Sequence, residues 1–110
     1  MFYETAKNDH GLQFDPFKSC VVPRPIGWIS TISSDGIANL APYSQFQNLT
    51  FDPPYVMYAA NQRTDGSRKD SVENAEQCKE FVYNLVTYNL REAMNQSSQE
   101  VPPNIDEFEL

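Results

Sequence analysis

The sequence predicts a mainly β domain with short helices, and three observations support this prediction. Several short runs are rich in β-branched and aromatic residues, which favour strands. Clusters of Gly, Pro, Asp and Ser, the usual turn residues, separate these runs. Only two segments show helix-start signals and both are short, which argues against a doubly wound α/β fold.

The first two strands are expected to form a β-hairpin. Ile26 to Ile32 contains β-branched residues and a tryptophan, and Ile37 to Leu40 resumes an extended pattern. Between them, Ser34-Asp35-Gly36 has turn chemistry. The proline within Ala41 to Ser44 has no N–H for a strand ladder, so we expect this segment to end the second strand.

Two further strands follow after another break. Asp52-Pro53-Pro54 interrupts the chain, Tyr55 to Ala60 is the third expected strand, and Phe81 to Val86 is the fourth. Four short strands leave two open edges and cannot close a barrel alone. Their apolar side chains would stay exposed in a single subunit, so we expect a homodimer that covers them.

Two short helices are predicted, from Ser71 to about Cys78 and from Leu90 to Asn95. Each is preceded by an acidic or amide residue, with a Glu three residues later, which resembles a capping box. The expected cap residues are Asp70 and Glu73 for the first helix, and Asn89 and Glu92 for the second.

Length and charge limit the classes of protein. The 110 residues suit one domain, which we place at residues 21–110 after an N-terminal arm of residues 1–20. The net charge of −7 argues against binding duplex nucleic acid and against a polybasic membrane anchor. No signal peptide and no membrane-spanning apolar run is recognisable. Cys20 and Cys78 lie far apart in sequence, which indicates free thiols in a reducing cytoplasm.

A basic cluster precedes the first helix. Arg63, Arg68 and Lys69 stand before a helix N-terminus, whose free N–H groups and partial positive charge attract anions, and Ser71 adds a hydroxyl. This arrangement predicts a phosphate site. The alternative from spacing alone is a solvated basic loop before an ordinary capped helix.

The segment Asn39 to Ser44 combines small and polar residues at the end of a predicted hairpin. Free backbone groups there could bind a planar heterocycle, or the segment could be a turn with an Asx or Ser cap. Aromatic side chains that could pack on a ring, or simply fill a core, are Trp28, Tyr43, Phe46, Tyr55 and Tyr58.

Residues for acid–base or nucleophilic catalysis are not apparent. The single histidine, His10, lies in the polar arm, so no Ser-His-Asp or Cys-His set can be assembled. Neither a Rossmann glycine motif nor a P-loop is present. An anion site without such groups is consistent with a bound cofactor that performs the chemistry.

Several segments together resemble the flavin reductase-like domain family, the FMN-binding split barrels. The matching stretches are Pro23 to Thr31, Gly36, Asn39 to Ser44, Phe46, Pro53-Pro54, Lys69-Asp70-Ser71 with Asn74, Glu80 to Val82, Asn84-Leu85, Met94-Asn95 and Asp106 to Phe108. Their order and spacing cover residues 20–110, and the resemblance implies a β-barrel with short helices.

The resemblance also implies a ligand and a set of contacts. In this family a dimer of six-stranded split barrels holds FMN near the subunit interface. Residues expected to line the flavin ring and ribityl chain are Ser30, Thr31, Asn39, Ala41, Pro42, Tyr43 and Ser44. Residues expected at the phosphate are Lys69, Asp70 and Ser71, with Arg63 and Arg68 as helpers and Asp70 contributing its backbone N–H or a helix cap.

The implied function is an FMN-dependent oxidoreductase that moves electrons between NADH or NADPH, flavin and a further acceptor. The alternative is a flavin-binding module without turnover. The family pattern usually continues well past Leu110, so we expect either a fragment or a truncated member whose barrel a partner chain completes.

Overall fold

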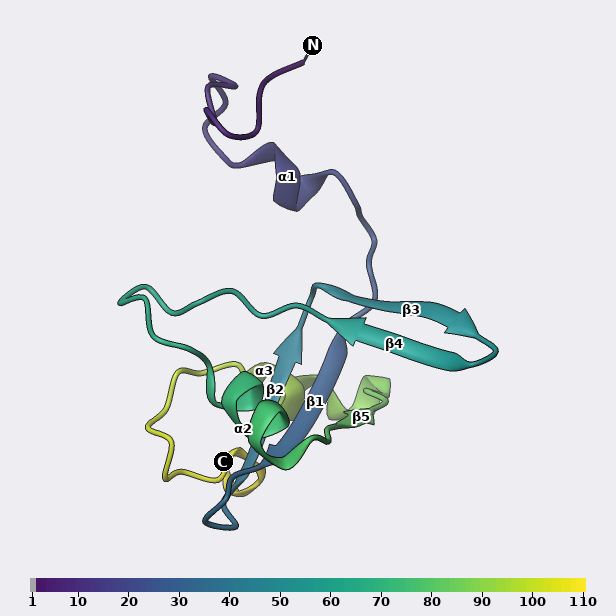
Figure 1. Ribbon diagram of the computed structural model, residues 1–110, viewed down its shortest axis with the longest axis vertical. Coiled ribbons are helices and arrows are strands. Elements are labelled where there is room, and N and C mark those ends of the chain that lie inside the picture. The colour runs from purple at the N-terminus through teal and green to yellow at the C-terminus, as the bar shows by residue number, and fades with distance from the viewer. Residues whose placement is uncertain (1) are drawn as a thin grey trace.

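The computed structural model describes residues 2–110, and its antiparallel strands and short helices confirm the mainly β prediction (Figure 1). In chain order the elements are α1 (Pro16–Ser19), β1 (Gly27–Ile32), β2 (Ala38–Tyr43), β3 (Phe46–Phe51), β4 (Pro54–Tyr58), α2 (Asp70–Cys78), β5 (Val82–Asn84) and α3 (Arg91–Gln96). Two 3-10 turns, η1 (Tyr88–Leu90) and η2 (Glu107–Glu109), precede α3 and lie near the C-terminus.

The strands form two antiparallel sheets. One has the order β2-β1-β5, and the other is the hairpin β3-β4. In the first sheet Thr31 is opposite Asn39 and Ile29 is opposite Ala41. Because side chains alternate between the faces of a strand, these four residues share one face. Helix α2 packs on that face, where the Asn74 amide donates a hydrogen bond to the Thr31 hydroxyl at 3.2 Å.

The core is small and lies where the two sheets meet. Ile29, Tyr43 and Phe46 are buried together, with Tyr58 and Phe81 packed against them. Trp28 is also buried, and its indole Nε1–H donates to the Ser97 hydroxyl at 2.9 Å. This hydrogen bond fastens the chain after α3 to the first strand, so the C-terminal segment can reach the β2 edge.

The prediction that the segment 41–44 ends the second strand is wrong. Strand β2 continues to Tyr43, with Pro42 opposite Trp28. β2 is an edge strand, and the N–H of Leu40 points away from β1, toward Glu107. Pro42 stands two residues further along, so its missing N–H falls on the same open edge and removes no ladder hydrogen bond.

Other boundaries also differ from those expected. Strand β3 was not predicted because polar Gln47 and Asn48 hide its pattern, and its partner β4 starts at Pro54, earlier than Tyr55. Asp70 does not cap α2, because the N-cap position belongs to Lys69 and no side chain caps it. Helix α3 likewise has no side-chain cap, so the pair Asn89 and Glu92 does not cap it.

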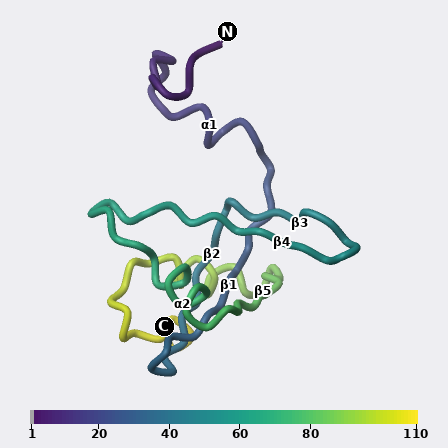
Figure 2. Tube along the Cα trace, in the orientation of Figure 1, coloured from purple at the N-terminus to yellow at the C-terminus, as the bar shows by residue number. Residues whose placement is uncertain are grey.

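The chain is more extended than a typical domain of its length. Its radius of gyration is 15.9 Å, compared with about 13 Å expected for 110 residues. The arm that contains α1 projects away from the sheets, and the two termini lie at opposite ends (Figure 2). Within residues 2–110, no helix has the length and apolarity that a membrane crossing requires.

Candidate functional site

A small pocket lies where the β2 edge meets the first turn of α2. Its volume is about 70 Å³, well below the roughly 300–1,000 Å³ of pockets that enclose a whole small ligand. It brings together most of the predicted site residues, namely Asn39, Ala41, Pro42, Tyr43, Arg63, Lys69, Asp70 and Ser71. Ser97 to Val101 and Glu107 complete the lining. This size suits one polar group of a ligand, with the remainder outside.

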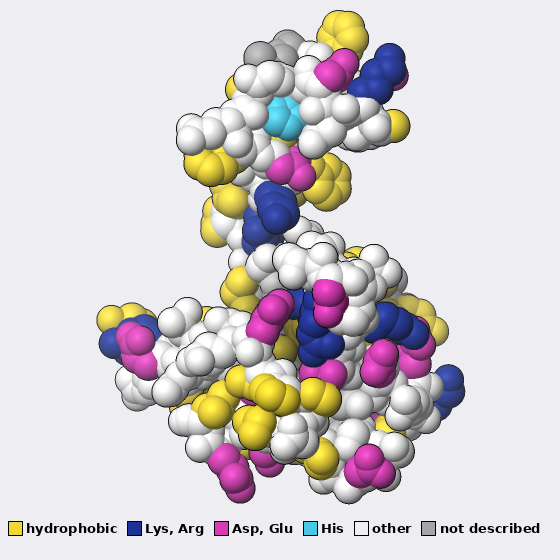
Figure 3. Space-filling view, turned by 90° about the vertical axis from the view of Figure 1, so that its left-hand side faces the viewer, with side chains coloured by type: hydrophobic (Ala, Val, Ile, Leu, Met, Phe, Trp, Pro, Cys, Tyr) yellow, Lys and Arg dark blue, Asp and Glu magenta, His cyan; other side chains and the backbone are white. Residues whose placement is uncertain are grey.

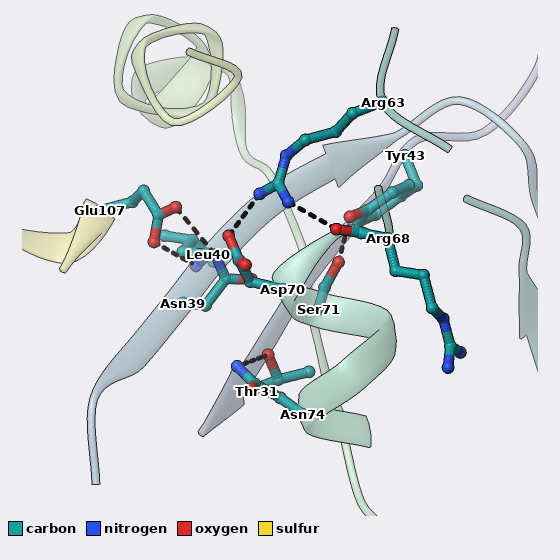
Figure 4. A network of polar contacts seen from close by, with 10 residues as sticks. All are labelled: Thr31, Asn39, Leu40, Tyr43, Arg63, Arg68, Asp70, Ser71, Asn74 and Glu107. Atoms are coloured by element: carbon teal, nitrogen blue, oxygen red, sulfur yellow. Dashed lines mark hydrogen bonds and ion pairs between the residues drawn. The ribbon is translucent and has the colours of Figure 1, made fainter. Parts of the chain in front are cut away.

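The two basic side chains of the pocket, Arg63 and Lys69, are used differently, and Figure 4 shows the contacts of Arg63. Arg63 forms an ion pair with Asp70 at 2.7 Å, and its other terminal nitrogen donates to the Arg68 carbonyl at 2.5 Å. Within residues 2–110, Lys69 forms no ion pair, and its ammonium lies 5.8 Å from the Tyr43 ring centroid. Lys69 is therefore the cation most available to a ligand.

The first turn of α2 adds backbone donors. The N–H groups of Val72 and Glu73 donate to the Lys69 carbonyl, and no side chain caps the helix. Among the described residues, the N–H groups of Asp70 and Ser71 have no hydrogen-bond partner. Unpaired first-turn donors and the helix dipole favour an anion at this end.

Tyr43 and Ser71 line one side of the pocket. The two hydroxyls are hydrogen-bonded, and the Tyr58 hydroxyl donates to the Ser71 carbonyl at 3.0 Å. Ser71 is only 1% exposed. Burial raises the pKa of Tyr43 above its ordinary value, although the hydrogen bond to Ser71 acts in the opposite direction. The Ser71 side chain thus fixes the aromatic wall, while its backbone N–H remains for a ligand.

Glu107 belongs to the pocket but was not among the predicted site residues. Its carboxylate accepts from the Asn39 amide at 2.8 Å and from the Leu40 N–H at 3.1 Å. Glu107 stands 68 residues from Asn39, so no local spacing links them. The closing DEF stretch matched the family pattern, and that match was the only signal in the sequence.

The structure places four other predicted residues outside this pocket. Ser30 accepts a hydrogen bond from Asn84, and Thr31 accepts one from Asn74. The Ser44 hydroxyl accepts from Arg24 at 3.3 Å. Arg68 pairs with Glu76 at 2.5 Å, and Figure 4 shows its side chain turned away from Asp70.

His10 also lies far from the site. It is in the projecting arm, where its Nδ1 accepts the Leu12 N–H at 2.9 Å and its ring meets Tyr3 edge-on.

The pocket offers a cation, backbone donors and an aromatic wall, which together can bind an anionic group.

Comparison with known proteins identifies the family. The model of the flavin reductase like domain matches residues 19–110, so the chain belongs to the flavin reductase-like domain family. The family is one of flavin-related oxidoreductases, and its match to residues 19–110 confirms the resemblance inferred from the sequence motifs.

Solved structures agree on the fold. Nitrilotriacetate monooxygenase component B from Bacillus cereus is 28% identical, with a TM-score of 0.83 over 99% of this chain and 54% of its own. The 2-nitrobenzoate 2-nitroreductase NbaA of Pseudomonas fluorescens is 27% identical, with a TM-score of 0.78 and 51% of its chain covered. The fold is therefore that of a split barrel, of which this chain supplies a part.

Curated relatives show the same partial coverage. An uncharacterized protein of Aquifex aeolicus is 48% identical over 89 residues, which are 81% of this chain and 45% of that protein. The uncharacterized protein YwrF of Bacillus subtilis is 38% identical over 90 residues, or 82% of this chain and 42% of its own. The chain spans less than half the length of these relatives.

Proposed function

We propose that this chain binds FMN and serves an oxidoreductase that passes electrons from NADH or NADPH through the flavin to a further acceptor. The strongest support is the pocket itself, in which Lys69 and the uncapped first turn of α2 meet the β2 edge. The chain that carries this pocket belongs to the flavin reductase-like domain family. When bound, FMN would supply the electron-transfer chemistry.

The residues present fit a phosphate group. Lys69 would donate a charge-assisted hydrogen bond, and the N–H groups of Asp70 and Ser71 would add two more. The Asp70 carboxylate, which would repel a phosphate, is neutralised by Arg63. Figure 3 shows basic side chains beside acidic ones elsewhere on the surface below the projecting arm.

The flavin ring would lie outside the small pocket, along the β2 strand end. Ala41, Pro42, Tyr43 and Ser44 would support it there, and Asn39 would face the ribityl chain. The family resemblance also predicts Ser30 and Thr31 at the flavin and Arg68 at the phosphate. These three assignments stay predictions.

Replacement of Lys69 tests the phosphate site. We expect Lys69→Ala to weaken FMN binding by about 10- to 100-fold, the loss of one hydrogen bond to a charged group. Riboflavin, which lacks the phosphate, should lose almost nothing. Both affinities can be measured by flavin fluorescence, with Lys18→Ala in the arm as the matched control. Equal losses for FMN and riboflavin would place the phosphate elsewhere.

A flavin-binding module without turnover is the second candidate. The partial coverage of the relatives supports it, because this chain corresponds to only 45% of the Aquifex aeolicus protein and 42% of YwrF. Absorbance of NADH and of NADPH, followed at saturating FMN with and without protein, separates the two functions. Protein-dependent oxidation of either nucleotide supports the enzyme, and none with either supports the module.

We also propose a cytoplasmic location and a homodimer. Both cysteines are free thiols, which suits a reducing compartment. The many exposed apolar side chains support self-association.

A further inference from the structure

Glu107 is a buried carboxylate, and the proposed function gives it no task. It is only 8% exposed, and within residues 2–110 it forms no ion pair. Its hydrogen bonds come from the Asn39 amide and from the Leu40 N–H at the open β2 edge. Burial of an ionised carboxylate is costly without a cationic partner, so its presence at a pocket wall needs an explanation.

Glu107 determines which end of the Asn39 amide remains available. Glu107 Oε1 accepts from the NH2 end of the amide, at 2.8 Å. The carbonyl end is left as an acceptor, and Asn39 Oδ1 is buried with no hydrogen-bond partner among the described residues. An unpaired buried acceptor is unfavourable until a donor reaches it.

Two opposite chemistries therefore line one pocket of about 70 Å³. Lys69 and the first turn of α2 attract an anion. Glu107 and Asn39 offer acceptors, which require a donor and would repel the anion itself. A ligand that satisfies both sides has a negatively charged group and, a few bonds away, a hydroxyl. A phosphorylated polyol chain has this arrangement, and FMN contains one.

We propose that Glu107, acting with Asn39, is the acceptor side of the site and selects for the hydroxyl groups of the ligand's polyol chain. This inference rests on the proposed FMN function and adds a specificity-determining residue to it. Lys69 then binds the phosphate, and Glu107 binds the hydroxyls of the polyol chain attached to it.

Three flavins separate these contributions. FMN has phosphate and polyol, riboflavin has the polyol alone, and lumiflavin has neither. We expect Glu107→Gln to weaken FMN and riboflavin alike, by about tenfold for one lost acceptor. Lumiflavin should change by less than about twofold, since it has no hydroxyl to lose. Glu109→Gln, at an exposed residue of the same 3-10 turn, makes the same charge change and should alter the binding of none of the three flavins.

A merely structural role for Glu107 gives a different pattern. If Glu107→Gln weakens lumiflavin as much as riboflavin, or weakens neither, the proposal is overturned. Glu107→Asp keeps the charge and withdraws the carboxylate by one methylene, so we expect partial recovery of riboflavin binding. It also replaces Glu107→Gln in the comparison if that variant does not fold. Failure of the wild type to bind any of the three flavins would instead overturn the FMN function itself.

Discussion

Single residues of this pocket act through the groups that their neighbours leave free. Asp70 occupies Arg63, which makes Lys69 the available cation. Ser71 holds Tyr43 through its hydroxyl, which leaves the backbone N–H of Ser71 as the group proposed to bind the phosphate. The NH2 group of Asn39 donates a hydrogen bond to Glu107, and its Oδ1 has no hydrogen-bond partner among the described residues. Each role follows from which hydrogen bond is already made.

Burial of Tyr43 predicts a loss of stability at alkaline pH. Its pKa in the fold is raised above the ordinary value of 10.0, mainly by desolvation. The folded state therefore holds the proton more tightly than the unfolded state. The stabilisation is fully present below the ordinary value and is lost as pH rises from there toward the folded pKa.

The free energy of unfolding, measured by urea titration from about pH 8 to about pH 11, checks this expectation. Tyr43→Phe should be less stable near neutral pH, because the Ser71 hydroxyl loses its partner, and its stability should fall less steeply above pH 10. The pKa of Tyr58 is also raised by burial, so part of the slope remains in the variant. Equal slopes for both proteins would contradict the role of Tyr43.

At the scale of elements, a close approach of backbone and ring joins the two sheets. A Cβ atom added at Gly27 would lie 2.5 Å from Phe46 Cδ2 and 2.7 Å from Phe46 Cγ. Phe46 is buried and stacks on Tyr83 with ring centroids 4.7 Å apart, so it has little room to move. Position 27 thus requires glycine, because Phe46 at the start of β3 lies against the first residue of β1.

We therefore expect Gly27→Ala to destabilise the fold by about 1–3 kcal/mol through overpacking. Adding Phe46→Leu should recover part of that loss, because the smaller side chain vacates the space, and the two changes should be non-additive. Thermal and urea unfolding of the single and double variants measure both effects. A fully stable Gly27→Ala protein would show that β3 is not held against β1 in this way.

Elements were predictable from sequence where local chemistry decides them. The Ile26–Ile32 strand, the Ser34–Gly36 turn and the helix from about Ser71 follow from β propensity, turn residues and helix signals. The end of β2 did not, because β2 is an edge strand and the missing N–H of Pro42 falls on its open edge, where no ladder hydrogen bond is lost. Local pattern alone cannot show which edge of a strand stays open.

The site was predictable in the same uneven way. The basic cluster before α2 and the Asn39–Tyr43 strand end were named from sequence, and the structure brings them into one pocket. Sequence reasoning gave Asp70 a capping role, but tertiary proximity to Arg63 gives its carboxylate an ion pair instead. Glu107 was missed because only folding brings it to Asn39.

Many large apolar side chains of the described residues are exposed, which is typical of a surface that another chain covers. In the β3-β4 hairpin, Leu49, Tyr55 and Phe51 are exposed, with Phe51 at 93%. The arm adds exposed Phe14 and Phe17. The hairpin runs past one end of the three-stranded sheet (Figure 1), and among the described residues neither of its outer edges pairs with a further strand.

These features predict self-association. A two-fold dimer would cover the exposed strand edges and apolar faces, and it would bring the β2 strand end close to a second subunit. Light scattering of the purified protein at micromolar concentration should give about twice the chain mass of 12.6 kDa. A monodisperse mass near that of one chain contradicts the dimer, and polydisperse high-mass material would show that the exposed surfaces aggregate instead.

Titration of the wild-type protein with FMN shows whether this pocket belongs to an FMN site. We predict saturable quenching of flavin fluorescence together with a shifted visible absorption spectrum, because the ring leaves water for the β2 strand end. If neither signal changes when FMN reaches high micromolar concentration, the chain does not bind FMN and the pocket is not an FMN site.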